Sequence, residues 1–537
     1  MIMNQTEKKE SNNIMNTKPK TLGELKASGY SFKSIKDELR DNLIKSLKSG
    51  TPTFPGIHGY ELTVIPQLER AILSKHNINL LGLRGQGKTR IARLMVKLLD
   101  EYIPVVAGSE LNDDPLEPIS RFAKDLINKE GDNTPIQWLH RDDRFFEKLA
   151  TPDVTIADLI GDIDPIKAAN LKLNYADERV LHFGMIPRAN RCIFVINELP
   201  DLQARIQVAL FNILEEGDIQ IRGFKLRIPL DVHFVFTANP EDYTNRGSIV
   251  TPLKDRIGSQ ILTHYSSDIS TAKKITEQEA SKLELRLPDV YMPELAKDII
   301  EQIAFEARRS EYVDYKSGVS ARMSITAYEN LVSTAERRAL LNNELKTTVR
   351  FSDLMGMIPS ITGKVELVYE GEQEGSSFVA NHLISQATKT LFNTYFPKIQ
   401  KLKKKEENTP YSEIINWFLA GNSVELSGNA NDKDRANILD SIQPLKKLVL
   451  KYQPHVSEND ILFFMEFVLW ALVDLKQLSK KRSEDKILFS EDHSERLNSG
   501  GRFRFRMTFC SSSFADFISI PESLLLLHPK IQRLDCL

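Results

Sequence analysis

Short apolar runs alternate with amphipathic segments between residues 60 and 265, and this pattern predicts the architecture. Three of the runs, at 77–81, 192–196 and 232–238, are predicted to be buried strands. The run at 192–196 is uninterrupted, and strands of that kind are typical of parallel sheets that are covered on both faces. A helix is predicted after the first run, because apolar residues recur there at helical spacing, at Ile91, Leu94, Met95, Leu98 and Leu99. Alternating strands and helices predict a parallel α/β sheet.

Two further elements are predicted between the second and third strands. The apolar residues Ile206, Leu210, Ile213 and Leu214 share one face of a helix. Residues 218–228 carry apolar side chains at alternate positions on either side of Gly223, a pattern that predicts a β-hairpin. Upstream of the sheet, residues 21–50 contain two short helical patterns.

The chain becomes mainly helical after Ser266. Amphipathic helices are predicted at 298–309 and 323–343, a short strand at 364–369, and a further helical region from 411 to 481. The apolar stretch 461–473 contains Glu466 and is shorter than the ~20 residues that cross a bilayer. We therefore predict a helix buried in protein, with core aromatic residues at Phe463, Phe464, Phe467 and Trp470.

Composition indicates an ordinary globular protein and argues against a few kinds of function and site. The chain has 537 residues, of which 41% are hydrophobic and 27% charged, as in ordinary globular proteins. Its net charge of -2 gives no support for a protein that binds nucleic acid. Cys192, Cys510 and Cys536 lack the spacing of zinc ligands or of a disulfide framework, and Cys192 is predicted to be a core residue. The polar start of the chain is not a secretory signal, so we expect a cytoplasmic compartment.

The clearest motif is a P-loop directly after the first strand. It reads Gly82-Leu83-Arg84-Gly85-Gln86-Gly87-Lys88-Thr89. Glycines let the backbone curl so that its N–H groups face phosphate oxygens, while the lysine reaches the β/γ-phosphates and the threonine hydroxyl faces Mg²⁺. A chance glycine-rich turn is the alternative, but the flanking strand and helix favour the loop. We therefore expect ATP and Mg²⁺ as cofactors.

Polar residues at the ends of the other two strands complete the candidate site. P-loop ATPases need groups there that hold Mg²⁺ and orient the attacking water. Asn197 and Glu198 end the second strand, where Glu198 can polarise water and Asn197 can contact a Mg²⁺-bound water without bringing a charge. Asn239 follows the third strand and can hold the water or the γ-phosphate. Arg256 comes shortly afterwards and can stabilise the transferring phosphoryl group.

Together these residues resemble an AAA+ ATPase of the helix-2-insert group, which includes the magnesium chelatase I subunit and the MoxR ATPases. The resemblance extends over residues 56–369. The family's strand with Asp-Glu and its helix ending in Leu-Glu-Glu-Gly correspond here to Asn197-Glu198 and to Leu214-Glu215-Glu216-Gly217. Residues 159–163 and 183–187 resemble the chelatase-type stretch before that strand.

The resemblance implies roles for single residues. Asn239 falls at the sensor 1 position, Arg256 at the arginine finger, and Arg322, within Ser320-Ala321-Arg322, at sensor 2 on a lid helix. The finger acts on a neighbour's nucleotide, so the resemblance implies a ring, expected to be a hexamer. It also implies a von Willebrand factor A domain partner and a protein client. Because Asn197 replaces the family's Mg²⁺-coordinating aspartate, Asn197→Asp is expected to hold or raise ATPase activity.

We accordingly predict an α/β fold, namely an AAA+ P-loop core with a helical lid and an additional, mainly helical C-terminal region. The predicted divisions are a disordered tail (1–20), a helical segment and linker (21–58), the core (59–265), the lid (266–375), a helical extension (376–490) and a tail of unassigned structure (491–537). The charged run 401–408 is expected to be a solvated linker.

Our leading hypothesis is a chaperone-like motor that hydrolyses ATP to remodel a protein partner. Three alternatives stay open. A motor subunit of a true metal chelatase would need a porphyrin system, for which the sequence has no recognisable site. A sigma-54-type transcriptional activator would carry a Gly-Ala-Phe-Thr-Gly-Ala loop, which is absent from this sequence. A scaffold that binds ATP and barely hydrolyses it is made credible by Asn197.

One further segment, 140–144, superficially resembles a kinase catalytic loop. It reads His-Arg-Asp-Asp-Arg but lacks the asparagine at the required spacing, and the chain has no Asp-Phe-Gly. We predict a charged surface turn there.

Overall fold

The computed structural model describes residues 18–172, 180–220, 227–240, 247–280, 288–399, 409–483 and 486–491. Most of the predicted tail 1–20, the hairpin tip at Gly223, the predicted linker 401–408 and nearly all of 491–537 lie outside these residues. The chain up to Glu491 forms one compact unit. Its finer division into domains remains a prediction.

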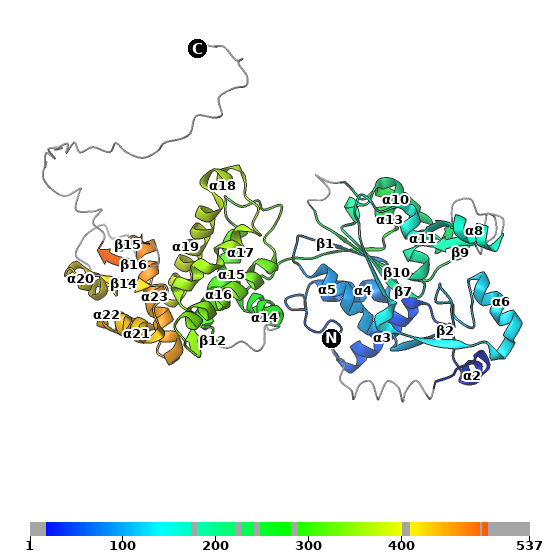
Figure 1. Ribbon diagram of the computed structural model, residues 1–537, viewed down its shortest axis with the longest axis horizontal. Helices are drawn as coiled ribbons and strands as arrows, with labels where there is room; N and C mark the ends of the chain where they lie inside the picture. The colour runs from blue at the N-terminus through cyan, green and yellow to red at the C-terminus, as the bar shows by residue number, and fades with distance from the viewer. Residues whose placement is uncertain are drawn as a thin grey trace, which may run out of the picture. The chain divides into compact units, whose positions relative to one another are not determined.

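Five parallel strands form the central sheet (Figure 1). They are β1 (Ile78–Leu81), β4 (Phe145–Leu149), β7 (Cys192–Asn197), β10 (Val232–Ala238) and β11 (Ser259–Leu262). Their order across the sheet is β11-β1-β10-β7-β4, and every neighbouring pair is parallel. The predicted parallel α/β sheet and its three predicted strands are therefore confirmed, and β4 and β11 add one strand at each edge.

Alternate residues of the same strands build the two faces of the sheet. Ile193 and Val195 of β7 belong to one hydrophobic cluster, whereas Phe194 and Ile196 belong to another. The first cluster includes side chains of α3 (Ile35–Ser49), α4 (Val64–Leu73) and α5 (Lys88–Leu94). The second includes side chains of α10 (Ala204–Ala209), α11 (Phe211–Glu215) and α13 (Thr251–Arg256). β7 is apolar from Cys192 to Ile196 because helices cover both faces of the sheet. The helix predicted around Leu210 is divided into α10 and α11 at that residue.

The segment before the sheet contributes to the core. α2 (Leu22–Ala27) and α3 confirm its two predicted helices. The Glu38 carboxylate of α3 accepts hydrogen bonds of 2.7 and 2.6 Å from the guanidinium of Arg144, and the two side chains are 5% and 1% exposed. A second buried pair joins Arg191 to Asp114 at 3.0 Å. The prediction of a surface turn at 140–144 is therefore wrong for Arg144, because the short 3-10 helix η3 (Arg141–Arg144) ends with this side chain directed at Glu38.

Three antiparallel strand pairs accompany the sheet within the described residues. β2 (Tyr102–Val106) pairs with β3 (Ile136–His140), β5 (Gly161–Ile163) with β6 (Leu181–Phe183), and β8 (Asp218–Gln220) with β9 (Arg227–Pro229). The last pair confirms the predicted hairpin. The β5–β6 pair brings together the two segments that resemble the chelatase-type stretch. Further α-helices described in this region are α6 (Arg121–Glu130), α7 (Ile156–Leu159), α8 (Pro165–Leu171) and α9 (Met185–Arg188).

The region after the sheet is largely helical. It comprises α14 (Ile269–Ala280), α15 (Glu294–Ala307), α16 (Ala321–Leu341), the 3-10 helix η7 (Phe351–Met357), α17 (Ile358–Thr362), α18 (Tyr369–Glu374) and α19 (Ser376–Tyr395), with a small pair of strands, β12 (Asp289–Tyr291) and β13 (Lys346–Thr348). α15 and α16 confirm the two predicted helices. The strand predicted at 364–369 is wrong, because Leu367 makes only an isolated bridge with Val313 and α18 begins at Tyr369.

The C-terminal extension combines helices with a small sheet. Its helices are α20 (Ser412–Leu419), α21 (Asp432–Asp440), α22 (Gln443–Tyr452) and α23 (Glu458–Asp474). β14 (Val424–Ser427), β16 (Lys486–Glu491) and β15 (Leu478–Ser483) form an antiparallel sheet in that order, which the sequence analysis does not predict. α23 is buried as predicted, with Phe463 and Phe467 fully inaccessible. Within the ranges described, no helix combines the length and apolar character needed to cross a membrane.

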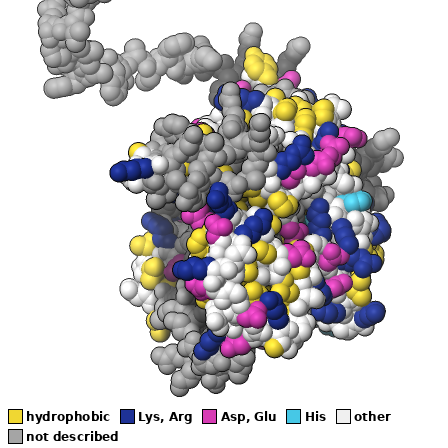
Figure 2. Space-filling view, turned by 90° about the vertical axis from the view of Figure 1, so that its right-hand side faces the viewer, with side chains coloured by type: hydrophobic (Ala, Val, Ile, Leu, Met, Phe, Trp, Pro, Cys, Tyr) yellow, Lys and Arg dark blue, Asp and Glu magenta, His cyan; other side chains and the backbone are white. Residues whose placement is uncertain are grey.

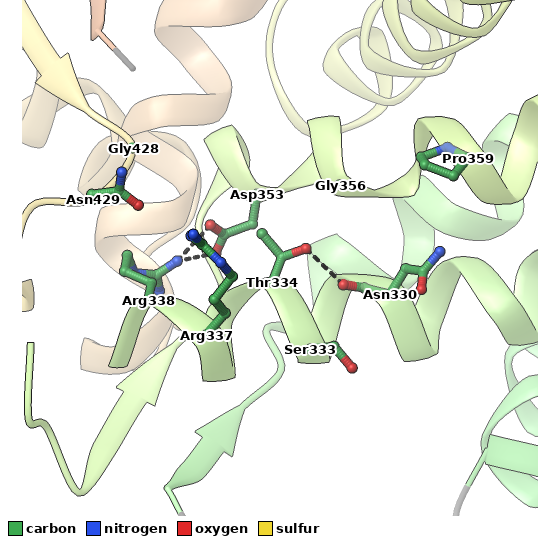
Figure 3. A pocket seen from close by; sticks show the side chains of 10 residues that line it. All are labelled: Asn330, Ser333, Thr334, Arg337, Arg338, Asp353, Gly356, Pro359, Gly428 and Asn429. Atoms are coloured by element: carbon green, nitrogen blue, oxygen red, sulfur yellow. Dashed lines mark hydrogen bonds and ion pairs between the residues drawn. The ribbon is translucent and has the colours of Figure 1, made fainter. Parts of the chain in front are cut away.

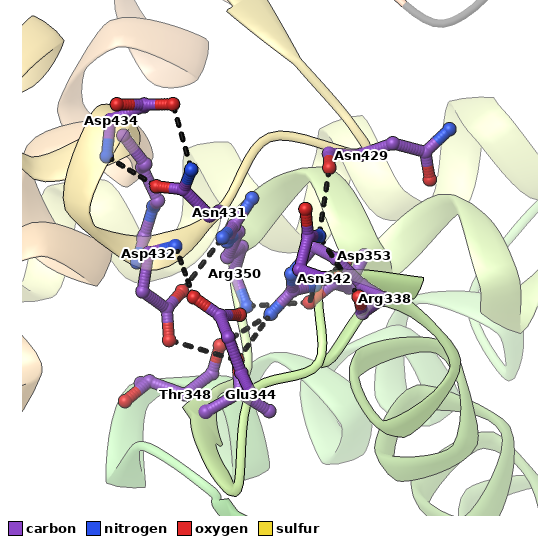
Figure 4. A network of polar contacts seen from close by, with 12 residues as sticks. Arg338, Asn342, Glu344, Thr348, Arg350, Asp353, Asn429, Asn431, Asp432 and Asp434 are labelled. Atoms are coloured by element: carbon purple, nitrogen blue, oxygen red, sulfur yellow. Dashed lines mark hydrogen bonds and ion pairs between the residues drawn. The ribbon is translucent and has the colours of Figure 1, made fainter. Parts of the chain in front are cut away.

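Three ion pairs lie where α16 and η7 meet the extension. They join Arg338 to Asp353 at 2.5 Å, Arg350 to Asp432 at 2.7 Å and Arg435 to Glu466 at 2.7 Å. Figure 4 shows the first two pairs and the hydrogen bond from Asn342 to the Asn429 carbonyl oxygen. Every member except Asp432 is at most 4% exposed. Buried charges need such partners, because an unpaired charge in a protein interior is very costly. We call these six residues the junction network.

Candidate functional site

The predicted P-loop lies between β1 and α5. Gly85 and Gly87 have φ angles of 72° and 73°, in the left-handed region that favours glycine. A Cβ atom at Gly85 would lie 2.1 Å from the Oγ of Ser320, the residue that caps the N-terminus of α16. The loop can therefore approach the start of α16 only because position 85 has no side chain.

The Lys88 ammonium group connects the loop to the neighbouring strand. It donates hydrogen bonds to the carbonyl oxygens of Gly82 and Leu83, the latter at 2.9 Å, and to Asn239 Oδ1 at 2.8 Å. Asn239 follows β10, which pairs with β1, so the sheet itself places the two residues side by side. Two predicted site residues that are far apart in sequence thus meet in the structure.

Side chains outside the motif hold the loop in place. The Tyr60 hydroxyl lies between the carbonyl oxygens of Gln86, at 2.9 Å, and of His264, at 2.6 Å, and its single proton is available to either acceptor. Burial raises the pKa of Tyr60 to about 12, so the hydroxyl keeps its proton at neutral pH. Thr263 Oγ1 donates to Gln86 Oε1 at 2.6 Å. Sequence reasoning missed Tyr60 and Thr263, which carry no motif and act only through the fold.

The end of β7 presents Asn197 and Glu198. Glu198 has φ 56° and ψ 48°, a left-handed conformation that is rare for a residue with a side chain. Its N–H group donates to Thr237 Oγ1 at 3.1 Å. Asn197 Nδ2 donates to Glu147 Oε1 on the edge strand β4 at 2.6 Å. Sequence reasoning missed Glu147 and Thr237; the only available signal was a charged residue inside the short run 145–149.

The two predicted arginines lie at the end of α13 and at the start of α16. Arg256 ends α13, where its guanidinium pairs with Glu215 at 2.6 Å and lies 4.9 Å from the centre of the Phe211 ring. Arg322 is in the first turn of α16, and its exposed side chain has no hydrogen bond or ion pair within the described residues. Thr89 is half-buried and makes no side-chain hydrogen bond to any described residue, Asn197 included.

A separate cavity of about 400 Å³ lies between α16, η7 and the Gly428–Asn429 turn. Figure 3 shows that Arg337, Arg338, Thr334 and Asn330 of α16 line it together with Asp353. None of the predicted nucleotide-site residues lines this cavity. On the face shown in Figure 2, described basic and acidic side chains are interspersed and form no single basic patch.

A known family model matches part of the chain. The family model for the AAA domain (dynein-related subfamily) matches residues 137–257. The match covers less than half of the chain and runs from β3 to just after the end of α13. It includes Asn197, Glu198, Asn239 and Arg256 and begins after the P-loop. No curated protein matches the sequence significantly.

Among solved structures, the chain is similar to NtrX from Brucella abortus. One NtrX structure is 14% identical over 57% of this chain and 58% of the NtrX chain, with a TM-score of 0.33. Its complex with ADP is 14% identical over 64% of both chains, with a TM-score of 0.36. The closed state of Hsp104 with ATPγS and FITC casein is 12% identical over 62% of this chain and 52% of that chain, with a TM-score of 0.34. The chain thus spans less than two thirds of these two NtrX structures, and likenesses this distant carry no information on function.

Proposed function

We propose, from the AAA domain at 137–257 and the P-loop before it, that this protein is an AAA+ ATPase of the magnesium chelatase I / MoxR type. It binds ATP with Mg²⁺ and hydrolyses it in a cytoplasmic ring, expected to be a hexamer, to remodel a protein partner in a chaperone-like way. The observation that carries the proposal is the hydrogen bond between Lys88 and Asn239 beside the left-handed glycines of the loop.

The loop residues suit a nucleotide phosphate. Lys88 donates to carbonyl oxygens of its own loop, and phosphate oxygens are stronger acceptors for the same charged donor. Residues 82–89 would hold the phosphates with their N–H groups. Thr89 would provide an oxygen atom of the kind that Mg²⁺ prefers, and Asn197 would contact a Mg²⁺-bound water. A bound Mg²⁺ would neutralise charge on the phosphates.

Glu198 and Asn239 are assigned to the hydrolytic step. Glu198 orients the attacking water and accepts a hydrogen bond from it, as acidic or amide residues do in other P-loop enzymes. Asn239 holds the water or the terminal phosphate from the side. Its Oδ1 already accepts a hydrogen bond from Lys88, which fixes the amide orientation and makes its Nδ2 the group that can face the nucleotide.

Arg256 and Arg322 act in the assembled ring. The contacts of Arg256 with Glu215, Phe211 and Pro252 all lie outside the loop, which supports a role on the neighbour's nucleotide. Arg322 serves as the sensor at the start of α16, whose cap residue lies against Gly85. A von Willebrand factor A domain protein is the proposed partner, alongside the client.

Asn197 favours a second candidate, a scaffold that binds ATP with little turnover. The Asn197 side chain is neutral, and its hydrogen bonds join it to Glu147 and Thr237. Turnover distinguishes the two candidates, since both require nucleotide binding.

The test compares the wild-type chain with Lys88→Ala and Glu198→Gln. We expect wild type to bind ATP and release phosphate, Lys88→Ala to lose binding, and Glu198→Gln to bind ATP without hydrolysis. Lys129→Ala, at an exposed residue of α6, is the control. Glu198→Gln in the ATP state should also retain client and partner in a pull-down. Binding by wild type without measurable turnover would favour the scaffold, and unchanged turnover in Glu198→Gln would exclude the role given to that residue.

A further inference from the structure

A continuous set of hydrogen bonds crosses three neighbouring strands at the end of β7. It runs from Arg93 on α5 to Glu147 on β4, then to Asn197, Thr237 on β10 and the N–H group of Glu198. The distances along it are 2.7, 2.6, 3.1 and 3.1 Å. Glu147 and Asn197 extend from the same face of the sheet, because Glu147 pairs with Val195 and Leu149 pairs with Asn197.

The chemistry of the end groups gives this set one direction. The Glu147 carboxylate can only accept hydrogen bonds, so the Asn197 amide must turn its Nδ2 towards it. Asn197 Oδ1 then faces Thr237, whose hydroxyl proton is donated to it at 3.1 Å. The Thr237 oxygen in turn accepts the N–H group of Glu198. Reversing the Asn197 amide would place its carbonyl oxygen against the Glu147 carboxylate, and the hydrogen bonds to Glu147 and from Thr237 would both be lost.

The last member of the set is the residue that needs support. Glu198 has φ 56° and ψ 48°, a conformation that costs free energy for any residue with a Cβ atom. Such a conformation persists only where the surroundings hold it. The bond from its N–H group to Thr237 is a restraint of that kind, and Thr237 is only 3% exposed.

We propose that Glu147 is a positioning residue for Glu198 and that Glu147 with Asn197 is a charge-exchanged pair. Of the two positions in this pair, the one that carries the negative charge is Glu147 on β4. The resemblance instead implies an aspartate, and so the negative charge, at position 197. Asn197 is then required by Glu147, since an aspartate would face another carboxylate at the 2.6 Å contact. This inference rests on the proposed function, in which Glu198 orients the water.

The pair makes a specific prediction about Asn197→Asp. Sequence alone leads us to expect held or raised activity, whereas the Glu147 contact leads us to expect a loss. The double variant Asn197→Asp/Glu147→Gln restores one charge and one donor, because the glutamine Nε2 can donate to the new carboxylate. Thr237 keeps its acceptor in both arrangements. The double variant should therefore recover what the single one loses.

The experiment is a cycle of four chains: wild type, Glu147→Gln, Asn197→Asp and the double variant. Two quantities are measured, the thermal unfolding midpoint without nucleotide and the kcat and KM for ATP. We expect Asn197→Asp to lower the midpoint and to lower kcat at least ~10-fold with KM changed less than ~3-fold, and the double variant to return within ~3-fold of wild type. Asp125→Asn, at an exposed carboxylate of α6, controls for loss of a charge.

Two results would overturn the proposal. If Asn197→Asp has the same effect in the wild-type chain as in the Glu147→Gln chain, the two positions are not coupled. If the midpoints are coupled while kcat is unchanged in every variant, Glu147 is structural and does not position Glu198. Failure of the proposed function is distinguishable, because the wild-type chain would then show no ATP turnover. The unfolding midpoints of the four chains would still show whether positions 147 and 197 are coupled.

Discussion

Removing the Glu38 carboxylate should destabilise the sheet core strongly, although Glu38 lies in the helical segment before that core. Glu38→Ala deletes the partner of Arg144, whose side chain is 1% exposed. It also deletes the acceptor of the Asp100 N–H group, which bonds to Glu38 Oε1 at 2.6 Å. The guanidinium would then be buried without the carboxylate that accepts two of its hydrogen bonds.

The magnitude follows from the burial of the pair. Breaking a buried ion pair by removing one partner costs about 3–5 kcal/mol, because the other charge stays desolvated. For a core of this size, each kcal/mol shifts the unfolding midpoint by roughly 2–4 °C, so the expected shift is about 6–20 °C. An exposed pair joins Asp41 of the same helix to Lys33, which lies just before it, at 2.9 Å, and their side chains are 40% and 49% exposed. Asp41→Ala should cost below about 1 kcal/mol.

Thermal and urea unfolding of Glu38→Ala and Asp41→Ala, side by side with wild type, test this reasoning. The double variant Glu38→Leu/Arg144→Met replaces the ion pair by apolar side chains and should recover most of the loss. Equal midpoints for Glu38→Ala and Asp41→Ala would refute the argument, and would mean that water or another group compensates Arg144.

Three further outcomes are expected. Burial raises the pKa of Asp231 to about 6, above its usual 3.8, so the folded wild-type chain loses stability as pH rises from about 4 to about 6. The free energy of unfolding of Asp231→Asn, measured by urea titration, should therefore exceed that of wild type by roughly 3 kcal/mol at pH 7 and by much less near pH 4. Arg256→Ala should keep ATP binding but lower steady-state phosphate release at least ~100-fold, and unchanged turnover would contradict the finger role. Glu466→Gln should leave Arg435 without its charge partner and lower the unfolding free energy by about 3 kcal/mol, measured against Glu425→Gln at an exposed pair.

The parts of the fold that sequence predicts well are those whose burial is complete. β7 and β10 are buried along nearly their whole length, so their apolar runs are unambiguous. The edge strand β4 reads Phe-Phe-Glu-Lys-Leu and is only partly buried, so its pattern is too weak to identify. The sheet of the extension pairs β14 with β16, which follows it by about 60 residues of chain. Periodicity within one segment cannot reveal a partner that distant.

The candidate site likewise contains residues that the sequence predicts and residues that only the fold reveals. Lys88 belongs to a motif whose spacing itself encodes the chemistry, and Asn239 follows from the end of an adjacent strand. Glu147 and Tyr60 act through contacts that only the folded chain creates. Asn197 shows most clearly what sequence alone cannot predict. Its residue type suggests a weakened Mg²⁺ site, whereas its hydrogen bond to Glu147 explains why an asparagine occupies this position.

The junction network also constrains how this protein can change over generations. Its three arginines and three acids sum to zero charge, and each pair joins residues contributed by different elements of the chain. A single substitution at any of these six residues leaves the opposite charge without its partner. Tolerated changes must therefore alter both residues of an ion pair together. Positions 338 and 353, 350 and 432, and 435 and 466 should therefore covary among homologues. The extension should be inherited together with α16, and a lineage that loses one is expected to lose the other.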